Sequence, residues 1–260
     1  MTTLATTVRA RHGAFRLAAG VVIVLVLVRQ LGADPFVDGL RAVRPWAVPA
    51  AVLLTAGTTW CCARRWTLVA QRHDVPLPLG VAYAAYYRSQ LLNVVLPGGV
   101  VGDVHRGVRH GWRGVLWERG IGQAVQIGLV GVLVLPHPWR WWGVAAFVLS
   151  AVALGAIVTW SALSTVGHLL VFVIAAQPTG LPLSTVLPIG ALVLLGAACP
   201  LNVAGWGPRE GVAASAFAAF GSTAATGLTV AVTFGVLSSL ATLPGLLVLA
   251  RHATGEGAPT

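Results

Sequence analysis

The sequence contains no lysine, few acids and little charge of either sign. Of its 260 residues, 7 are acidic and 9 % are charged. Soluble globular domains carry about 25 % charged residues, so the composition excludes an ordinary cytosolic enzyme and a disordered chain. Three cysteines, two of them adjacent at Cys61 and Cys62, exclude a disulfide scaffold and match no metal-binding spacing. We therefore expect no metal and no other cofactor.

What the sequence does contain is apolar residues and arginine. Hydrophobic residues make up 57 % of the chain, the mean hydropathy is +0.82, and the net charge is +10. A basic chain can bind nucleic acid, but no solvated segment is long enough to carry such a patch, so we expect no nucleic-acid partner. The composition predicts instead a multi-pass membrane protein whose arginines mark mainly the cytoplasmic side.

Several segments are apolar and long enough to approach a membrane span, which takes about 20 helical residues. The polar stretch at 64–78 is expected to lie along the membrane surface as an amphipathic piece. We expect one integral membrane domain over residues 1–250, followed by a short polar tail at 251–260. The six predicted transmembrane helices are 14–31, 46–63, 115–135, 139–158, 162–177 and 224–250.

Two further apolar segments, 79–113 and 183–222, are interrupted by proline and glycine. Broken backbone at membrane depth is tolerated only where protein or a water-filled cavity surrounds it. A pair of such segments, one in each half of the chain, is typical of a transporter-type binding site. The predicted fold is therefore an all-α polytopic membrane protein, with about six full transmembrane helices plus two re-entrant or broken-helix hairpins, eight membrane segments in total.

The distribution of arginine favours hairpins over full spans. Full spans would place Arg106, Arg109 and Arg113 outside the cell, whereas the positive-inside rule keeps them inside. We expect a cell-membrane protein with cytoplasmic N- and C-termini, whose hairpins enter from opposite faces and meet near the midplane. In this arrangement the cytoplasmic face holds Arg9, Arg11, Arg16, Arg64, Arg65, Arg72, Arg106, Arg109, Arg113 and Arg251.

The first hairpin combines exposed backbone amides with a charged pair. Amides at Gly98, Gly99 and Gly102 can bind an anion, and Arg106 can add a forked contact to phosphate. Asp103 is spaced to pair with Arg106. Alternatively, Asp103 caps a helix that starts at Val104, and Arg106 and Arg113 extend to the headgroup layer. One helical face of each arm is predominantly polar, with Tyr83, Tyr86, Gln90, Asn93 and Pro97 on the first arm and Asp103, Arg106, His110, Arg113 and Trp117 on the second.

The second hairpin places a cation where it is unfavourable. Pro208 suits the first position of a helix, which puts Arg209 in the first turn, where it opposes the helix dipole by about 0.3–1 kcal/mol. A charge at membrane depth costs roughly 2.5–3.5 kcal/mol on insertion scales. Arg209 therefore needs a partner, which is Glu210, Asp103 or a substrate anion. A buried Arg209–Glu210 pair that only fixes the hairpin is the structural alternative.

Other polar groups give weaker signals. Arg119, Gln123 and Gln126 share one helical face, and Ser161, Thr165 and His168 share another. We expect His168 to be a satisfied packing histidine. No P-loop and no Ser/His/Asp grouping is present, and Asp103, His105 and His110 match no metal motif, so we predict no metal ligands.

The order of these motifs resembles a known family, the flippase-like membrane domain of lysylphosphatidylglycerol synthases and its stand-alone relatives. The resemblance covers roughly residues 45–250 and departs from the family pattern at Val101, Glu118 and Pro208. It implies movement of lipids with modified anionic headgroups between leaflets. No soluble aminoacyl-transferring domain is present, so we expect no synthase activity. The motifs are Asn93-x3-Pro97-Gly98-Gly99-x2-Gly102-Asp103-x2-Arg106, Glu118-Arg119-x2-Gly122, Gly205-Trp206-Gly207-x-Arg209-Glu210-Gly211 and Leu243-Pro244-Gly245.

We therefore predict a lipid flippase-like protein whose partner is a membrane lipid with an anionic headgroup. The headgroup contains phosphate and is aminoacylated or glycosylated. Asp103, Glu118 and Glu210 are the acids placed to couple movement to an ion, and no residue is predicted to be catalytic. The predicted phosphate site consists of Asn93, Pro97, Gly98, Gly99, Gly102, Asp103, Arg106, Arg119, Gly205, Trp206, Gly207, Arg209 and Glu210.

Two alternative functions stay open at the level of sequence. One is an integral-membrane transferase or hydrolase acting on a lipid-phosphate substrate, with a base among Asp103, His105, His110 and Glu210. The other is a docking subunit for a separate lipid-modifying enzyme. The sequence does not define an oligomeric state.

Overall fold

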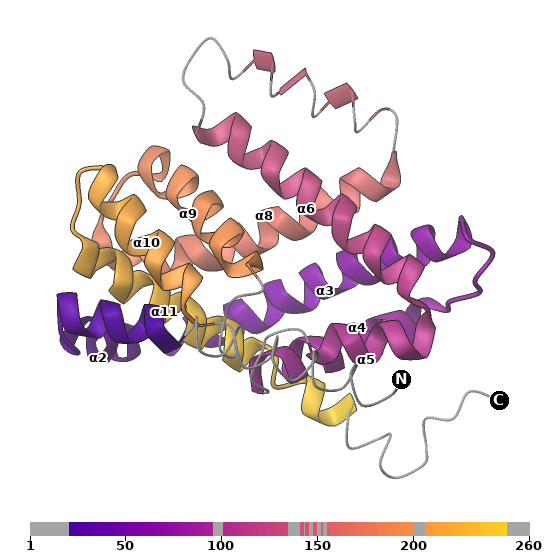
Figure 1. The fold of residues 1–260 in the computed structure, drawn as a ribbon, viewed down its shortest axis with the longest axis horizontal. Coiled ribbons are helices and arrows are strands. Elements are labelled where there is room, and N and C mark those ends of the chain that lie inside the picture. Colours follow the sequence, from indigo (N-terminus) through magenta and orange to yellow (C-terminus); the bar gives the residue numbers. More distant parts are fainter. Residues whose placement is uncertain are drawn as a thin grey trace, which may run out of the picture.

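The structure is a computed structural model that describes residues 21–95, 101–134, 141–142, 144–145, 148–149, 152, 155–199 and 206–248, without the side chains of residues 101 and 110. Every regular element in these ranges is a helix (Figure 1). The all-α class predicted from composition is therefore confirmed.

The helices form one bundle in which neighbours in sequence frequently pack as neighbours in space. Within the described ranges, two helices are both long and apolar enough to cross a membrane, Ala156–Thr179 and Ala224–Val248. Most of the predicted span at 139–158 lies outside the described residues. The elements are a helix at Val21–Leu31, α2 (Asp34–Arg41), α3 (Ala47–Gln71), α4 (Leu79–Val95), α5 (Val101–His110), α6 (Trp112–Val134), α8 (Ala156–Ala176), the 3-10 turn η1 (Gln177–Thr179), α9 (Leu183–Ala198), α10 (Pro208–Ala219) and α11 (Ala224–Ala241).

The apolar core lies where α3, α8, α9, α10 and α11 meet. Phe172 and Phe234 meet edge-to-face at its centre, with ring centroids 5.6 Å apart. Small residues bring the helices close together, since a Cβ added at Gly227 would lie 2.4 Å from the backbone oxygen of Ala213. Close packing through small residues is typical of helices associating in lipid.

Helix α3 is longer than predicted. It continues to Gln71, and it buries Arg65 and Trp66. The predicted surface piece at 64–78 is therefore wrong over 64–71. The physical reason is that this end of α3 packs against α4, where Trp66 meets Tyr86 edge-to-face with centroids 5.8 Å apart.

Two helix pairs correspond to the predicted hairpins. Helix α4 packs against α5, and α9 packs against α10; the connecting residues 96–100 and 200–205 lie outside the described ranges. The second arms are short, at 10 residues in α5 and 12 in α10. The predicted polar face running from Asp103 to Trp117 is interrupted, because Gly111 has φ +90° between α5 and α6, a conformation that suits glycine.

Close packing within the first pair leads to a stability prediction. A Cβ at Gly102 would lie 2.0 Å from the backbone oxygen of Ser89, which cannot move without separating α4 from α5. We expect Gly102→Ala to lower the free energy of unfolding by about 1–3 kcal/mol, measured by denaturant titration in detergent. Gly57→Ala is the matched control, because its Cβ would meet nothing within 4 Å. Equal stability of the two variants would contradict this account of the packing.

Candidate functional site

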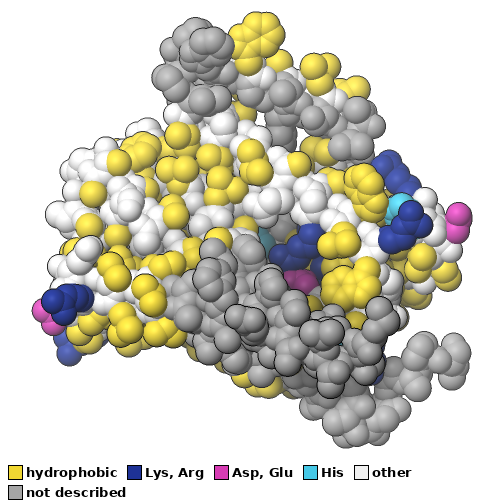
Figure 2. Space-filling view, viewed as in Figure 1, with side chains coloured by type: hydrophobic (Ala, Val, Ile, Leu, Met, Phe, Trp, Pro, Cys, Tyr) yellow, Lys and Arg dark blue, Asp and Glu magenta, His cyan; other side chains and the backbone are white. Residues whose placement is uncertain are grey.

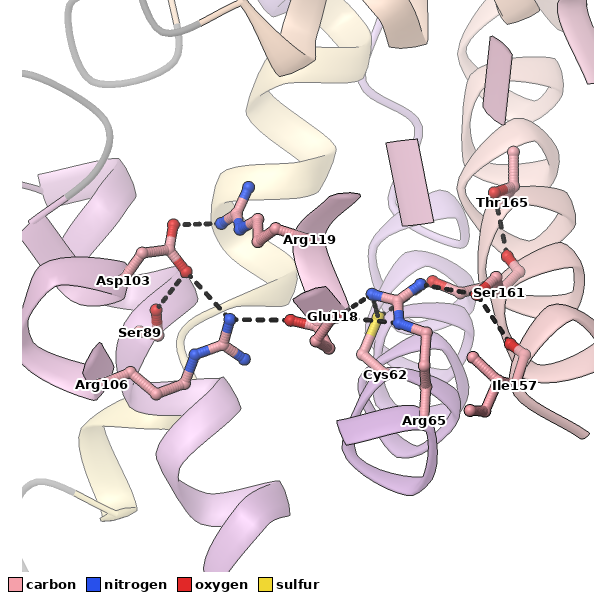
Figure 3. Close-up of polar contacts among 11 residues, drawn as sticks. Cys62, Arg65, Ser89, Asp103, Arg106, Glu118, Arg119, Ile157, Ser161 and Thr165 are labelled. Carbon is pink, nitrogen blue, oxygen red and sulfur yellow. Dashed lines mark hydrogen bonds and ion pairs between the residues drawn. The ribbon is translucent and has the colours of Figure 1, made fainter. Parts of the chain in front are cut away.

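A network of charged side chains joins α3, α5 and α6 (Figure 3). At its centre the carboxylate of Glu118 is 0 % exposed. It accepts hydrogen bonds from Nε of Arg65 at 2.8 Å and from Nη2 of Arg106 at 3.0 Å. Because charge-assisted bonds of this kind are strong in a water-excluded site, Glu118 ties three separate helices together.

The carboxylate of Asp103 is the second anion of this network. It bonds to the guanidinium of Arg119 and accepts from Nη2 of Arg106 at 3.3 Å, which confirms the predicted Asp103–Arg106 pair. Ser89 and Asn93 donate to it at 3.3 and 3.1 Å. Helix α5 begins at residue 101, so Asp103 lies inside the first turn and the alternative in which it caps the helix is wrong.

Arg106 is the most enclosed cation of the network. It is 1 % exposed, and its guanidinium carbon lies 3.9 Å from the ring centroid of Tyr86 and 4.6 Å from that of Trp66. Within the part of the chain that the structure describes, its buried Nε and Nη1 atoms have no hydrogen-bond partner. Aromatic faces therefore stabilise part of its charge, and Arg106 occupies the interior beside Glu118.

The predicted bare amides of the first hairpin can be checked at one position. The backbone N–H of Gly102 donates to Oδ1 of Asn93 at 2.8 Å, so this amide is already occupied. Pro97, Gly98 and Gly99 lie outside the described residues. Within the described part of the hairpin, Gly102 and Asn93 hold α4 against α5.

The second hairpin holds its own ion pair at the start of α10. Glu210 is 0 % exposed and accepts from Nε of Arg209 at 2.8 Å and from the backbone N–H of Gly207 at 2.7 Å. Helix α10 begins at Pro208, as predicted. The guanidinium of Arg209 also lies 5.0 Å from the ring centroid of Trp206. Among the partners considered for Arg209, the structure assigns Glu210; the predicted residue Gly205 lies outside the described ranges.

A cavity of about 350 Å³ lies between the Glu118 network and the Arg209–Glu210 ion pair. Three arginines from three helices line it, namely Arg65 of α3, Arg119 of α6 and Arg209 of α10. In Figure 2, dark blue arginine and magenta acidic atoms are visible in a hollow near the centre of the face. Arg119 is the most accessible of the three, with 53 % of its side chain exposed.

The polar helical faces predicted from sequence also meet at this cavity. Gln123 and Gln126 line it beside Arg119, and Thr165 and His168 line it from α8. The ring Nδ1 of His168 lies 2.7 Å from the backbone oxygen of residue 164. His168 thus has a partner on its own helix, as predicted, while its ring also borders the cavity.

Of the predicted site residues that the structure describes, Arg119 and Arg209 line the cavity, and the others are absent from its lining. Asp103 bonds to Arg119 and to Arg106, and Glu210 bonds to Arg209. Each of the three predicted coupling acids, Asp103, Glu118 and Glu210, is engaged by at least one arginine.

Arg65 is the functional candidate that sequence reasoning missed. It was counted among the cytoplasmic arginines, yet it bonds Glu118 and donates to Ser161 at 3.2 Å. A signal was present, because Arg65 continues the helical face of Thr58 and Cys62, which α3 also buries. Among Arg65, Arg106, Arg119, Asp103 and Glu118, three cations face two anions, so the network retains one positive charge.

Comparison with known proteins gives a family match for the part of the chain that contains the Glu118 network. Residues 13–135 match the family described as lysylphosphatidylglycerol synthase TM region. The matched part contains α3 to α6 and the whole Glu118 network. A search of curated proteins and of solved structures found no match.

Proposed function

Residues 13–135 belong to the lysylphosphatidylglycerol synthase transmembrane family, and from this premise we propose that the protein moves a lipid with a phosphate-containing headgroup between leaflets. The family directly supports a membrane protein with a lipid-related function. The proposed transport of a lipid between leaflets rests in addition on the cavity described above.

The observation that carries the proposal is the convergence of three arginines on one cavity. Arg65, Arg119 and Arg209 come from positions far apart in sequence and line the same 350 Å³ space. A guanidinium presents a planar fork of N–H donors that matches phosphate oxygens. The one positive charge that the Glu118 network retains favours a ligand with a single anionic group. In this proposal Arg106, which is 1 % exposed, acts through Glu118 instead of touching the phosphate.

The lengths of the helices support the proposed membrane arrangement. At 1.5 Å per residue, α5 and α10 extend about 15 and about 18 Å, whereas the hydrocarbon core is about 30 Å thick. The hairpins they close are therefore proposed to re-enter the membrane instead of spanning it. We keep the eight-segment arrangement, the cell-membrane location and the cytoplasmic termini as parts of this proposal.

Transport through such a site needs alternate access to the headgroup from each side. Acyl chains would stay in the bilayer while the headgroup occupies the arginine-lined cavity. Of the three predicted coupling acids, Asp103 is the most accessible to an ion or proton, since its side chain is 13 % exposed while Glu118 and Glu210 are enclosed. We propose Asp103 as the coupling acid if movement is driven by an ion.

The test is leaflet-resolved labelling of a fluorescent phosphatidylglycerol probe in vesicles that contain the purified protein. Wild type should move the probe faster than empty vesicles, and Arg119→Gln should slow it about tenfold or more, since 1.4 kcal/mol of lost binding is tenfold. Arg113→Gln is the matched control on the same helix, because Arg113 is exposed and lies outside the cavity lining. An Arg119→Gln variant as fast as wild type would show that the cavity is not the site.

A further inference from the structure

The described residues that line the central cavity include three cations and no acid. Arg65, Arg119 and Arg209 border the space, while Glu118 and Glu210 are 0 % exposed beneath them. Asp103 is engaged by Arg106 and Arg119 and is also absent from the lining. The cavity surface is therefore positive, although the groups around it are nearly neutral in sum.

The remaining polar lining is neutral and rich in amides. Gln123 and Gln126 border the cavity from α6. A primary amide both donates and accepts hydrogen bonds. Together with Thr165, these side chains suit hydroxyl groups better than a second charge.

The aromatic faces near the cavity are already occupied by arginine. The guanidinium of Arg209 lies over Trp206 and Phe234, at 5.0 and 5.7 Å from their ring centroids. Arg106 covers Tyr86 in the same way. Carboxylates and open aromatic faces bind an ammonium ligand more strongly than neutral oxygens do. Near the cavity, the carboxylates and rings of the described residues are engaged by the protein's own cations.

From these observations we infer that the cavity selects a lipid headgroup bearing one phosphate and several hydroxyl groups, and rejects a headgroup that also bears an ammonium group. The inference rests on the proposed function and narrows its substrate class to glycerol- or sugar-phosphate lipids. An aminoacylated headgroup would place its ammonium among three guanidinium groups in a site of reduced dielectric. Repulsion of that kind is a usual means of excluding a wrong ligand.

Three fluorescent probes with identical acyl chains test the inference on the wild-type protein in vesicles. They are phosphatidylglycerol, the same lipid esterified with lysine, and a lipid carrying glucose on its phosphate. We expect the glycerol and glucose probes to change leaflet about tenfold faster than the lysyl probe, equivalent to 1.4 kcal/mol of discrimination. A lysyl probe as fast as phosphatidylglycerol overturns the inference and leaves the proposed function standing. If none of the three probes moves faster than in empty vesicles, the proposed function itself is overturned.

A charge-adding variant tests whether the cavity sets the selectivity. Gln123→Glu places a carboxylate in the lining and should raise the rate of the lysyl probe relative to phosphatidylglycerol by about tenfold. Gln177→Glu adds the same charge on the exposed η1 turn, where Gln177 accepts from Arg44, and should leave the ratio unchanged. An unchanged ratio in Gln123→Glu, or an equal change in both variants, overturns the assignment of selectivity to this cavity.

Discussion

Replacing Glu118 with alanine should lower the free energy of unfolding by about 3–5 kcal/mol, the usual cost of removing one partner of a buried ion pair. The carboxylate is 0 % exposed and accepts from Arg65 and Arg106. Its loss leaves Arg106 with Asp103 as its remaining anion and leaves Arg65 with hydrogen bonds to Ser161 and Cys62. We expect the three helices α3, α5 and α6 to lose their common tie.

Thermal and denaturant unfolding of purified protein in detergent measure this effect. Asp38→Asn is the control, because it removes one negative charge at an exposed position of α2 and should change stability by about 0.5 kcal/mol or less. In an Arg65→Met background the Glu118→Ala change should cost less, with a coupling of about 0.5–3 kcal/mol. Purely additive effects would show that Arg65 and Glu118 do not stabilise each other.

The ion pairs that sequence predicted are the local ones. Asp103 and Arg106 lie three residues apart, so helical geometry places them on one face, and Arg209 and Glu210 are adjacent at the start of α10. Arg65 and Glu118 are separated by 53 residues, and no periodicity connects them. The position of Arg65 beside Trp66 also fits the pattern of an interfacial belt. Only the packing of α3 against α4 and α6 shows that both side chains are interior.

In the fold, too, the features set by local sequence were predictable and those set by packing between helices were not. Proline and glycine punctuation predicted where the two helix pairs divide, because these residues act on the local backbone. The extension of α3 past Ala63 was missed, because a polar end of a helix becomes interior only when a partner helix covers it. The interruption at Gly111 was missed for a related reason, since a φ of +90° is permitted by glycine but not required by it.

Alanine at position 235 should slow lipid movement strongly while leaving the protein folded. A Cβ there would lie 2.1 Å from Nη2 and 2.8 Å from Cζ of Arg209. Because the guanidinium is the flexible end of a long side chain, it can turn away and so leave the cavity, while Nε keeps its bond to Glu210. We expect a loss of transport of about tenfold or more and a change in unfolding free energy of about 1 kcal/mol.

Gly120→Ala makes this test specific to Arg209. Gly120 lies in α6 beside the cavity residue Arg119, yet its added Cβ would meet nothing within 4 Å. It should transport at the wild-type rate and gain up to about 1 kcal/mol from helix propensity. Rate measurements on both variants, with unfolding measured in parallel, separate displacement of one arginine from a general effect of alanine in a helix. Transport at the wild-type rate by Gly235→Ala would mean that Arg209 has no part in moving the headgroup, because its observed position would then be dispensable.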